Sequence, residues 1–318
     1  MNIKNVVVVG GGMMGNALAQ VFASNPDLHV TLKTRALRDD RWDMINNNLD
    51  IMISRGAATE EEKAAIISRI HFEVDEAKAY TDADFIIECA PEVMETKQDL
   101  FCTIEKYCSD KCILATNSSV MSCTEIGSKC VHPERVVGAH FWNPGHLIPL
   151  VEVIKSDVTE EWVIEETMEL MTVCGKKPVY CKKDVPGFVA NRLQHALWRE
   201  AFYMVENGIA DAKTVDDACK YGPGLRWPVM GPMENSDLVS IQLSKNIHDY
   251  ILPHLADNHE PSKCLAEMLE RGDNGFKTGK GWQEWTPEEI LAAVKEDVDA
   301  FRDHGLVCKL ISTGKRTE

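Results

Sequence analysis

Two residues able to move a proton stand inside apolar segments of the chain. His140 is near the end of the run 136–141, and Glu152, twelve positions later, lies within the run 150–154. A carboxylate in a buried apolar strand is costly unless a cation or a proton donor pairs with it. We therefore predict that Glu152 accepts from one imidazole nitrogen while the other exchanges a proton with a substrate hydroxyl or carbonyl. The alternative is that His140 is a core histidine whose hydrogen bonds are satisfied, and that Glu152 belongs to a structural ion pair.

A glycine-rich turn near the start of the chain could bind a dinucleotide. It reads Gly10-Gly11-Gly12-Met13-Met14-Gly15, which contains G-x-G-x-x-G, between the apolar run 6–9 and the helical segment 16–22. In that context Gly10 permits the tight turn, Gly12 lets the backbone approach a diphosphate, and Gly15 lets the helix pack close to the sheet. The helix N-terminus would add N–H donors and a partial positive charge. This context favours a dinucleotide site, which includes Met13 and Met14, over a purely structural turn.

The residues after the second expected strand bear on the choice between NAD and NADP. An acid that binds the adenosine ribose is expected at the end of that strand. The strand covers 29–33, and the chain continues with Thr34 and Arg35. A hydroxyl and a guanidinium would suit the 2′-phosphate of NADP. A solvated surface charge is an equally good interpretation of Arg35, so both cofactors stay open.

Further polar residues follow expected strands. Asn117, Ser118 and Ser119 come after the run 112–115, and His140 is followed by Phe-Trp-Asn-Pro. Ligands of α/β sheets bind at the carboxyl ends of the strands. Together with Glu152, these groups predict one candidate site at the edge of a sheet.

The elements that must position these residues show two patterns. Short apolar runs, typical of strands buried on both faces of a parallel sheet, occur at 6–9, 29–33, 85–87, 112–115, 136–141, 150–154 and 179–182. Helical spacing follows at 189–205, 214–220, 237–251, 262–269 and 286–304. The pattern changes at Pro186-Gly187. We predict a doubly wound α/β domain over residues 1–185 and an all-helical domain over 186–318.

The composition is that of a folded globular protein and argues against several partners. Among 318 residues, 50 are acidic and 34 basic, and the net charge of −16 would repel nucleic acid. No run approaches the roughly 18 apolar residues of a membrane span, and the N-terminus lacks a signal-peptide pattern. The 11 cysteines show no metal-ligand spacing. We expect a cytoplasmic protein with reduced thiols and no metal, nucleic acid or membrane partner.

Longer motifs extend over most of the chain, at the Gly10 turn and at 88–92, 117–119, 140–144, 150–153, 185–192 and 277–282. This ordered set resembles the 3-hydroxyacyl-CoA dehydrogenase family. The resemblance implies a Rossmann domain followed by a helical dimerisation domain, with the substrate between the two. It also implies that His140 is the general acid or base and that Glu152 orients it.

The resemblance implies contacts for further residues. Ser119 and Asn191 would hydrogen-bond the reacting oxygen, and Asn143 would hold the pocket around His140. Glu92 and Lys97 would lie beside the nicotinamide and its ribose. Ala90 and Asn117 belong to the same expected cofactor site.

The chain departs from the acyl-CoA members of this family at two places. Pro149 stands ahead of the Leu-Val-Glu run, where those members usually have a lysine. The segment 222–232 resembles members that oxidise small free hydroxy acids, such as carnitine dehydrogenases and the pyridoxine-degradation dehydrogenase. There Arg226 could bind a free carboxylate bidentately, and Trp227 could face an apolar or cationic substituent. The alternative is that both residues pack within a turn rich in proline and glycine.

These features predict an oxidoreductase that interconverts a 3-hydroxy acid and its 3-oxo form by hydride transfer with NAD or NADP. One alternative keeps the reaction but makes the substrate a 3-hydroxyacyl-CoA such as 3-hydroxybutyryl-CoA. The other is a non-catalytic cofactor-binding protein of crystallin or sensor type, which the intact set of Ser119, His140, Glu152 and Asn191 disfavours. His146 is expected at the surface or behind the site.

Overall fold

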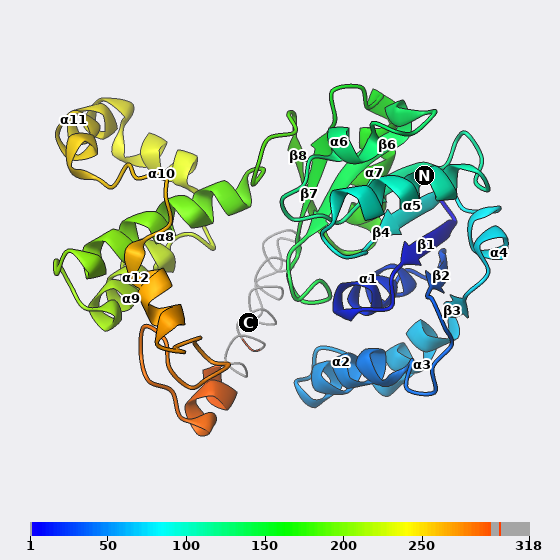
Figure 1. The fold of residues 1–318 in the computed structure, drawn as a ribbon, viewed down its shortest axis with the longest axis horizontal. Helices are drawn as coiled ribbons and strands as arrows, with labels where there is room; N and C mark the ends of the chain where they lie inside the picture. The colour runs from blue at the N-terminus through cyan, green and yellow to red at the C-terminus, as the bar shows by residue number, and fades with distance from the viewer. Residues whose placement is uncertain (1, 294–298, 300–318) are drawn as a thin grey trace, which may run out of the picture. The chain divides into compact units, whose positions relative to one another are not determined.

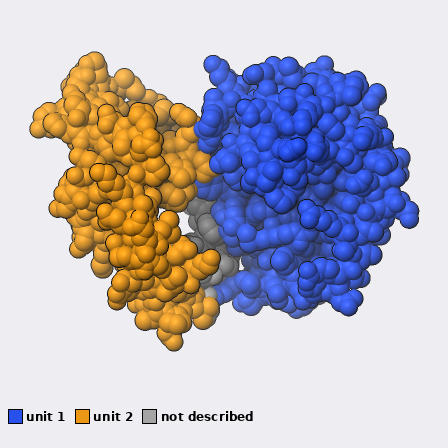
Figure 2. Space-filling model, viewed as in Figure 1, with its two compact units in different colours: residues 1–190 blue, residues 191–318 orange. Residues whose placement is uncertain are grey.

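The computed structural model describes residues 2–293 and 299. The chain divides into two compact units, residues 1–190 and 191–318 (Figure 2). All eight strands of the sheet lie in the first unit.

Unit 1 is built around one sheet with the strand order β3-β2-β1-β4-β5-β6-β7-β8. Neighbouring strands run parallel except at the pair β6 and β7. The strands are β1 (Asn5–Val9), β2 (His29–Lys33), β3 (Ile70–Glu73), β4 (Phe85–Glu88), β5 (Ile113–Thr116), β6 (Val136–Phe141), β7 (Leu150–Lys155) and β8 (Lys177–Cys181). The first six positions have the order of a Rossmann sheet, which confirms the predicted fold class.

Helices cover both faces of this sheet because both faces are apolar (Figure 1). On β1, Val6 and Val8 pack into one buried cluster, and Val7 and Val9 pack into the other. The first cluster includes residues of α1 (Met13–Ala23), α2 (Asp43–Ser54), α3 (Glu60–Ser68) and α7 (Glu161–Val173). The second includes residues of α4 (Glu76–Tyr80), α5 (Met94–Glu105) and α6 (Cys123–Gly127). Two-sided burial explains why most strands appear in the sequence as continuous apolar runs.

β3 was not predicted from the sequence. This strand lies at the edge of the sheet, and Ile70 is its one buried residue. An edge strand needs few apolar side chains, so Ile-His-Phe-Glu gives no apolar run.

Unit 2 contains α8 (Ala190–Glu206, whose first residue belongs to unit 1), α9 (Ala212–Tyr221), α10 (Pro232–Val239), α11 (Ile241–Ile251) and α12 (Lys263–Glu270). The prediction of one helix over 237–251 was wrong. Ser240 has φ of +85° and separates α10 from α11, and its side chain accepts from Leu243 N–H at the start of α11. A further helix covers 287–293, preceded by the predicted capping box of Thr286 and Glu289. Except for residue 299, its predicted continuation to 304 lies outside the described residues.

Candidate active site

The turn between β1 and α1 requires glycine at defined positions. Gly10 has φ of +119°, and a Cβ there would lie 2.8 Å from the carbonyl oxygen of Cys89. A Cβ on Gly15 would lie 1.7 Å from the carbonyl oxygen of Gly10, so α1 could not pack against the turn. A Cβ on Gly12 would meet no atom of the described chain within 4 Å. Gly12 therefore leaves the space that a diphosphate needs.

The N-terminus of α1 suits an anion. Gly12 is its N-cap, and no side chain of the described residues caps it. The side-chain amide of Asn16 donates to the carbonyl oxygens of Gly11 and Gly12, both at 2.9 Å, which holds the turn together. Met13, in the first helical position, is 60% exposed. Backbone N–H groups and the helix dipole thus meet open space, and these residues fit the diphosphate of NAD.

Thr34 lies beside this turn at the end of β2. A Cβ on Gly11 would come within 2.9 Å of the Thr34 methyl carbon, whereas Arg35 is exposed. The nearby acid at the end of β3, Glu73, accepts from two backbone N–H groups of its own turn at 2.7 and 2.8 Å. The end of β2 therefore has the hydroxyl and guanidinium that the sequence analysis noted, and the contacts of Thr34 and Arg35 with a cofactor stay predictions.

A buried ion pair lies at the end of β4. The Lys97 side chain on α5 is 1% exposed and donates to Glu88 Oε1 at 2.6 Å. Glu88 is fully buried, and it also accepts from Ala90 N–H at 2.5 Å and from the Thr116 hydroxyl at 2.8 Å. No role for Glu88 was predicted from the sequence. Lys97 Nζ also lies 3.4 Å from Glu92 Oε2, and its predicted contact with the cofactor stays a prediction.

Residues after β5 connect this ion pair to β6. Glu92 accepts from the Ser118 hydroxyl at 2.8 Å and from Ser119 N–H at 3.1 Å. The side-chain oxygen of Asn117 accepts from Phe141 N–H at 2.9 Å. These contacts hold Ser119 next to the end of β6.

The strand pairing brings the predicted acid–base residues together. In the antiparallel register of β6 and β7, His140 stands directly opposite Glu152. His140 Nδ1 lies 2.9 Å from Glu152 Oε2, and His140 Nε2 lies 3.2 Å from Ser119 Oγ. Because a carboxylate only accepts, Glu152 places the imidazole proton on Nδ1 and leaves the lone pair on Nε2. The predicted contact is present, with the basic nitrogen facing Ser119.

Glu152 is fully buried and accepts four hydrogen bonds. Besides His140, the Trp142 indole donates to Oε2 at 3.2 Å, and the N–H groups of Val189 and Ala190 donate to Oε1 at 2.9 Å. Burial alone would raise the pKa of Glu152, but these four hydrogen bonds outweigh it and hold the pKa below its ordinary value. Glu152 therefore stays charged and can stabilise an imidazolium at His140.

Sequence reasoning missed three of these donors. Trp142 follows His140 by two positions, and the two-residue period of a strand could have placed it on the same face. Val189 and Ala190 act through backbone N–H groups, which no residue type reveals.

The loop between β6 and β7 is held by Lys176. Its ammonium donates to the carbonyl oxygens of Gly145 and Ile148 at 2.6 and 2.9 Å. Burial lowers the pKa of Lys176 to about 8. His146 in this loop is half-buried, and burial together with the nearby Lys176 charge lowers its pKa to about 4. His146 is therefore a neutral residue of the loop at ordinary pH.

The remaining predicted substrate residues are Asn143, Asn191, Arg226 and Trp227. Asn143 is exposed and joined to Pro144 by a cis peptide bond. Asn191 is the second residue of α8. Arg226 is exposed and donates to Asn235 Oδ1 at 2.9 Å, and Trp227 is 43% exposed. Asn191, Arg226 and Trp227 belong to unit 2, and the role of all four residues stays a prediction.

Within the described residues, no group of three or more His, Cys, Asp or Glu side chains could hold a metal ion. The helices in that part of the chain are all too short or too polar to cross a membrane. Its ten cysteines are free thiols.

Two family models match consecutive parts of the chain. The NAD-binding domain of 3-hydroxyacyl-CoA dehydrogenase matches residues 5–185, and the C-terminal domain of the same family matches residues 187–285.

Curated relatives match over nearly the whole chain. The L-carnitine dehydrogenase of Streptomyces griseus is 34% identical over 317 residues, covering 97% of this chain and 88% of that protein. The 5-formyl-3-hydroxy-2-methylpyridine 4-carboxylate 5-dehydrogenase of Mesorhizobium japonicum is 30% identical, covering 92% and 94%. The 3-hydroxybutyryl-CoA dehydrogenase of Clostridioides difficile is 31% identical, covering 88% and 99%. Among solved structures, an NAD⁺-dependent 5-formyl-3-hydroxy-2-methylpyridine 4-carboxylic acid 5-dehydrogenase matches with a TM-score of 0.86 at 29% identity, covering 99% of this chain and 100% of that one.

Proposed function

The chain belongs to the 3-hydroxyacyl-CoA dehydrogenase family, and from this premise we propose that it oxidises a small free 3-hydroxy acid reversibly, with His140 and Glu152 as the acid–base pair. It is an oxidoreductase that acts on a CH–OH group. One observation carries the assignment of the pair. His140 Nδ1 lies 2.9 Å from a fully buried carboxylate while Nε2 faces the Ser119 hydroxyl.

In the proposed mechanism each residue has a distinct task. The turn at Gly10 and the N-terminus of α1 hold the diphosphate of NAD, which supplies the hydride acceptor when bound. His140 Nε2 takes the proton of the substrate hydroxyl as the hydride leaves C3, and Glu152 stabilises the imidazolium that forms. The Ser119 hydroxyl donates to the substrate oxygen, where negative charge develops, and Asn191 is a second donor to it. The reverse reaction returns both hydrogens to the ketone.

The cofactor is NAD, since the first domain is the NAD-binding domain of the family. Thr34 and Arg35 are the residues that would allow the enzyme to use NADP as well as NAD. Comparing KM for NADH and NADPH tests this point, and we expect the lower value for NADH. A clear preference for NADPH would instead give Arg35 a contact with the 2′-phosphate.

Two features support a free acid as substrate. Arg226 presents an exposed guanidinium that a carboxylate could bind bidentately, and a thioester would lack that charge. Relatives named for carnitine and for a pyridine carboxylate match over most of the chain. The second candidate is a 3-hydroxyacyl-CoA, favoured by the match to 3-hydroxybutyryl-CoA dehydrogenase.

Purified protein assayed with free 3-hydroxy acids and with 3-hydroxybutyryl-CoA, by nicotinamide absorbance, separates the two candidates. Arg226→Ala should raise KM for the acid about tenfold or more, as expected when a charge-assisted bidentate contact is lost. Arg271→Ala is the matched control, because Arg271 is an exposed arginine of the same unit, paired with Asp273. An unchanged KM in Arg226→Ala would exclude carboxylate capture.

We also propose a cytoplasmic homodimer formed through unit 2. Several large apolar side chains of this unit are exposed by two thirds or more, namely Tyr221, Leu225, Val229, Met233, Leu238 and Tyr250. Exposed apolar side chains mark an interaction surface where they form one contiguous patch, and we propose that these residues do so. Analytical ultracentrifugation should give twice the chain mass, and a stable monomer at micromolar concentration would overturn the dimer. Fractionation of the source cells tests the compartment.

A further inference from the structure

Two cysteines lie together at the opposite end of β5 from Ser119. Cys108 follows α5, Cys112 immediately precedes β5, and a turn closed by Cys112 N–H on the Ser109 carbonyl oxygen at 3.0 Å connects them. The two thiols are close enough for each to shift the pKa of the other, and the Cys112 thiol donates to the Ile113 carbonyl oxygen at 3.7 Å. Cys108 is 8% exposed and Cys112 is fully buried. The fold thus holds the two thiols as neighbours on one turn, and Cys108 is the less buried of the two.

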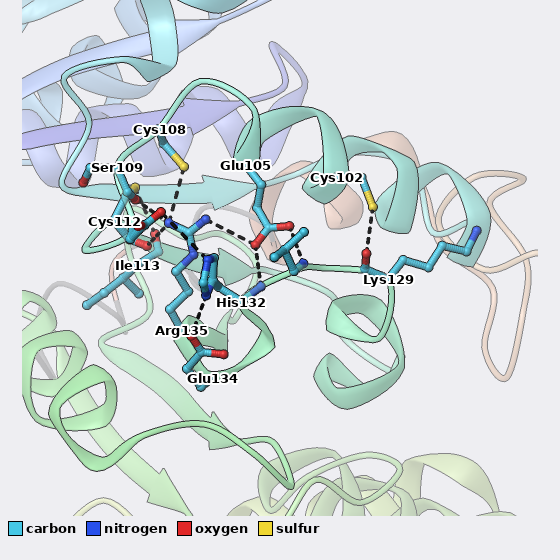
Figure 3. Close-up of polar contacts among 12 residues, drawn as sticks. Cys102, Glu105, Cys108, Ser109, Cys112, Ile113, Lys129, His132, Glu134 and Arg135 are labelled. Atoms are coloured by element: carbon cyan, nitrogen blue, oxygen red, sulfur yellow. Dashed lines mark hydrogen bonds and ion pairs between the residues drawn. The ribbon is translucent and has the colours of Figure 1, made fainter.

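Arg135 places a buried positive charge against this pair (Figure 3). Its side chain is 2% exposed, and its Nη1 lies 3.6 Å from Cys108 Sγ and 3.3 Å from the Cys112 carbonyl oxygen. Nη1 also donates to the Ser109 carbonyl oxygen. Arg135 Nε is buried and has no hydrogen-bond partner within the described part of the chain. The guanidinium therefore still has a donor that a negative charge nearby would help to compensate.

The acidic partner of Arg135 is itself shared. Glu105 lies 3.2 Å from Arg135 Nη2, and it also accepts from the N–H groups of Val131 and His132 at 2.8 and 3.0 Å. Glu105 thus spreads its charge over three donors. A thiolate at Cys108 would give Arg135 a second anionic neighbour.

The two thiols differ in acidity: Cys108 is the more acidic, and Cys112 is the less acidic. The neighbouring Cys112 and the charge of Arg135 outweigh burial and lower the pKa of Cys108 to about 7. The neighbouring Cys108 and burial raise the pKa of Cys112. Elsewhere burial raises the pKa of Cys130 and Cys174, both to about 12. A low-pKa thiol next to a protonated one is the arrangement found in reactive cysteine pairs.

We propose that Cys108 and Cys112 form a dithiol site that hydroperoxides oxidise to an intramolecular disulfide. The Cys108 thiolate attacks one oxygen of hydrogen peroxide, the O–O bond breaks, and hydroxide leaves with a sulfenic acid on Cys108. The sulfur of Cys112 then attacks this sulfenic sulfur, the S–O bond breaks, and the thiol proton leaves with the hydroxyl as water. Two thiols and one peroxide thus give one disulfide and two waters, with two electrons passing from sulfur to oxygen. Burial of Cys108 favours a small oxidant over a bulky disulfide such as oxidised glutathione.

The chain sequence makes the product easy to identify. Full-length reduced protein is treated with hydrogen peroxide, its remaining thiols are blocked, and it is digested with trypsin without reduction. Cleavage after Lys106, Lys111 and Lys129 separates the two cysteines into the peptides 107–111 and 112–129. We expect these peptides to be recovered as one linked species that separates on reduction. Because the second peptide also contains Cys123, fragmentation must place the link at Cys112.

Two variants resolve the steps. Cys112→Ser should stop the reaction at a sulfenic acid on Cys108, which a cyclic 1,3-dione traps, and Cys108→Ser should remove both the adduct and the link. Cys102→Ser is the matched control and should leave the link unchanged, because Cys102 is the half-buried thiol of α5 that donates to the Lys129 carbonyl oxygen. In the wild-type protein Cys108 should oxidise about tenfold faster than Cys102, because the Arg135 guanidinium 3.6 Å from Cys108 Sγ favours the thiolate there.

The wild-type measurement decides the proposal even if a variant fails to fold. Recovery of 107–111 as a free thiol peptide, under peroxide treatment that oxidises Cys102 in the folded protein, would overturn it. A link from Cys108 to Cys123 would overturn it as well. These readouts do not depend on the dehydrogenase reaction, so they stand apart from the proposed function.

Discussion

Replacing Glu152 by glutamine changes one atom of the site and tests the acid–base pair directly. The carboxylate accepts two hydrogen bonds on each oxygen, from His140 and Trp142 on one side and from the N–H groups of Val189 and Ala190 on the other. A glutamine has one accepting oxygen, so in either orientation two donors lose their acceptor. If its NH₂ faces His140, it donates to Nδ1 and moves the imidazole proton to Nε2. That tautomer cannot take a proton from the substrate.

The expected size of the effect follows from these contacts. Loss of general-base function lowers kcat about 10²- to 10⁴-fold, which corresponds to about 2.7–5.4 kcal/mol of transition-state free energy. Two lost hydrogen bonds to a charged group lower the free energy of unfolding by about 3–6 kcal/mol. Affinity for NAD should be retained, because the glycine turn at the end of β1 is unchanged.

The assay combines turnover at saturating substrate, NAD binding by fluorescence, and urea unfolding. Glu166→Gln is the matched control, since Glu166 on α7 is a half-buried carboxylate that accepts from Asn2 at 2.8 Å, and its turnover should stay normal. Because Glu152 acts through His140, the double variant with His140→Gln should be about as slow as His140→Gln alone. Multiplied losses in the double variant, or normal turnover in Glu152→Gln, would refute the reasoning.

Three further predictions concern neighbouring features. Gly12→Ala should leave the Tm of the cofactor-free protein unchanged but weaken NAD binding about tenfold or more, because its Cβ meets no described protein atom and enters the space of the diphosphate; unchanged NAD affinity by calorimetry would contradict this. With its pKa lowered to about 4, His146 contributes stability that is present above its ordinary pKa and is lost as pH falls from about 6.5 toward 4. Between pH 7 and pH 5 the wild-type protein should thus lose about 2 kcal/mol more unfolding free energy than His146→Leu. Equal losses in the two proteins, measured by urea unfolding at both pH values, would contradict this prediction. Lys97→Met leaves the fully buried Glu88 without its cation and should destabilise the fold by about 3–5 kcal/mol. An unchanged Tm would show that groups other than Lys97 compensate the charge of Glu88.

The fold class could be predicted from the sequence because each feature used was local. Runs such as 112–115 are apolar throughout since both faces of the sheet are covered, and the glycines at 10, 12 and 15 report backbone requirements of a single turn. The helix break at Ser240 gave no such signal, because its positive φ depends on how the chain turns between α10 and α11. The edge strand β3 gave none either, because partial burial needs few apolar side chains.

For the site, the sequence by itself determined that a histidine and a carboxylate occur in consecutive apolar strands, and therefore that Glu152 needed a donor. Tertiary structure alone decided which donors it has. The reversal of β7 against β6 sets the register that places His140 opposite Glu152, and the backbone at 189–190 supplies two more bonds from a segment far along the chain. Spacing along the chain cannot encode such contacts, because strand direction and register are set by the packing of the whole sheet.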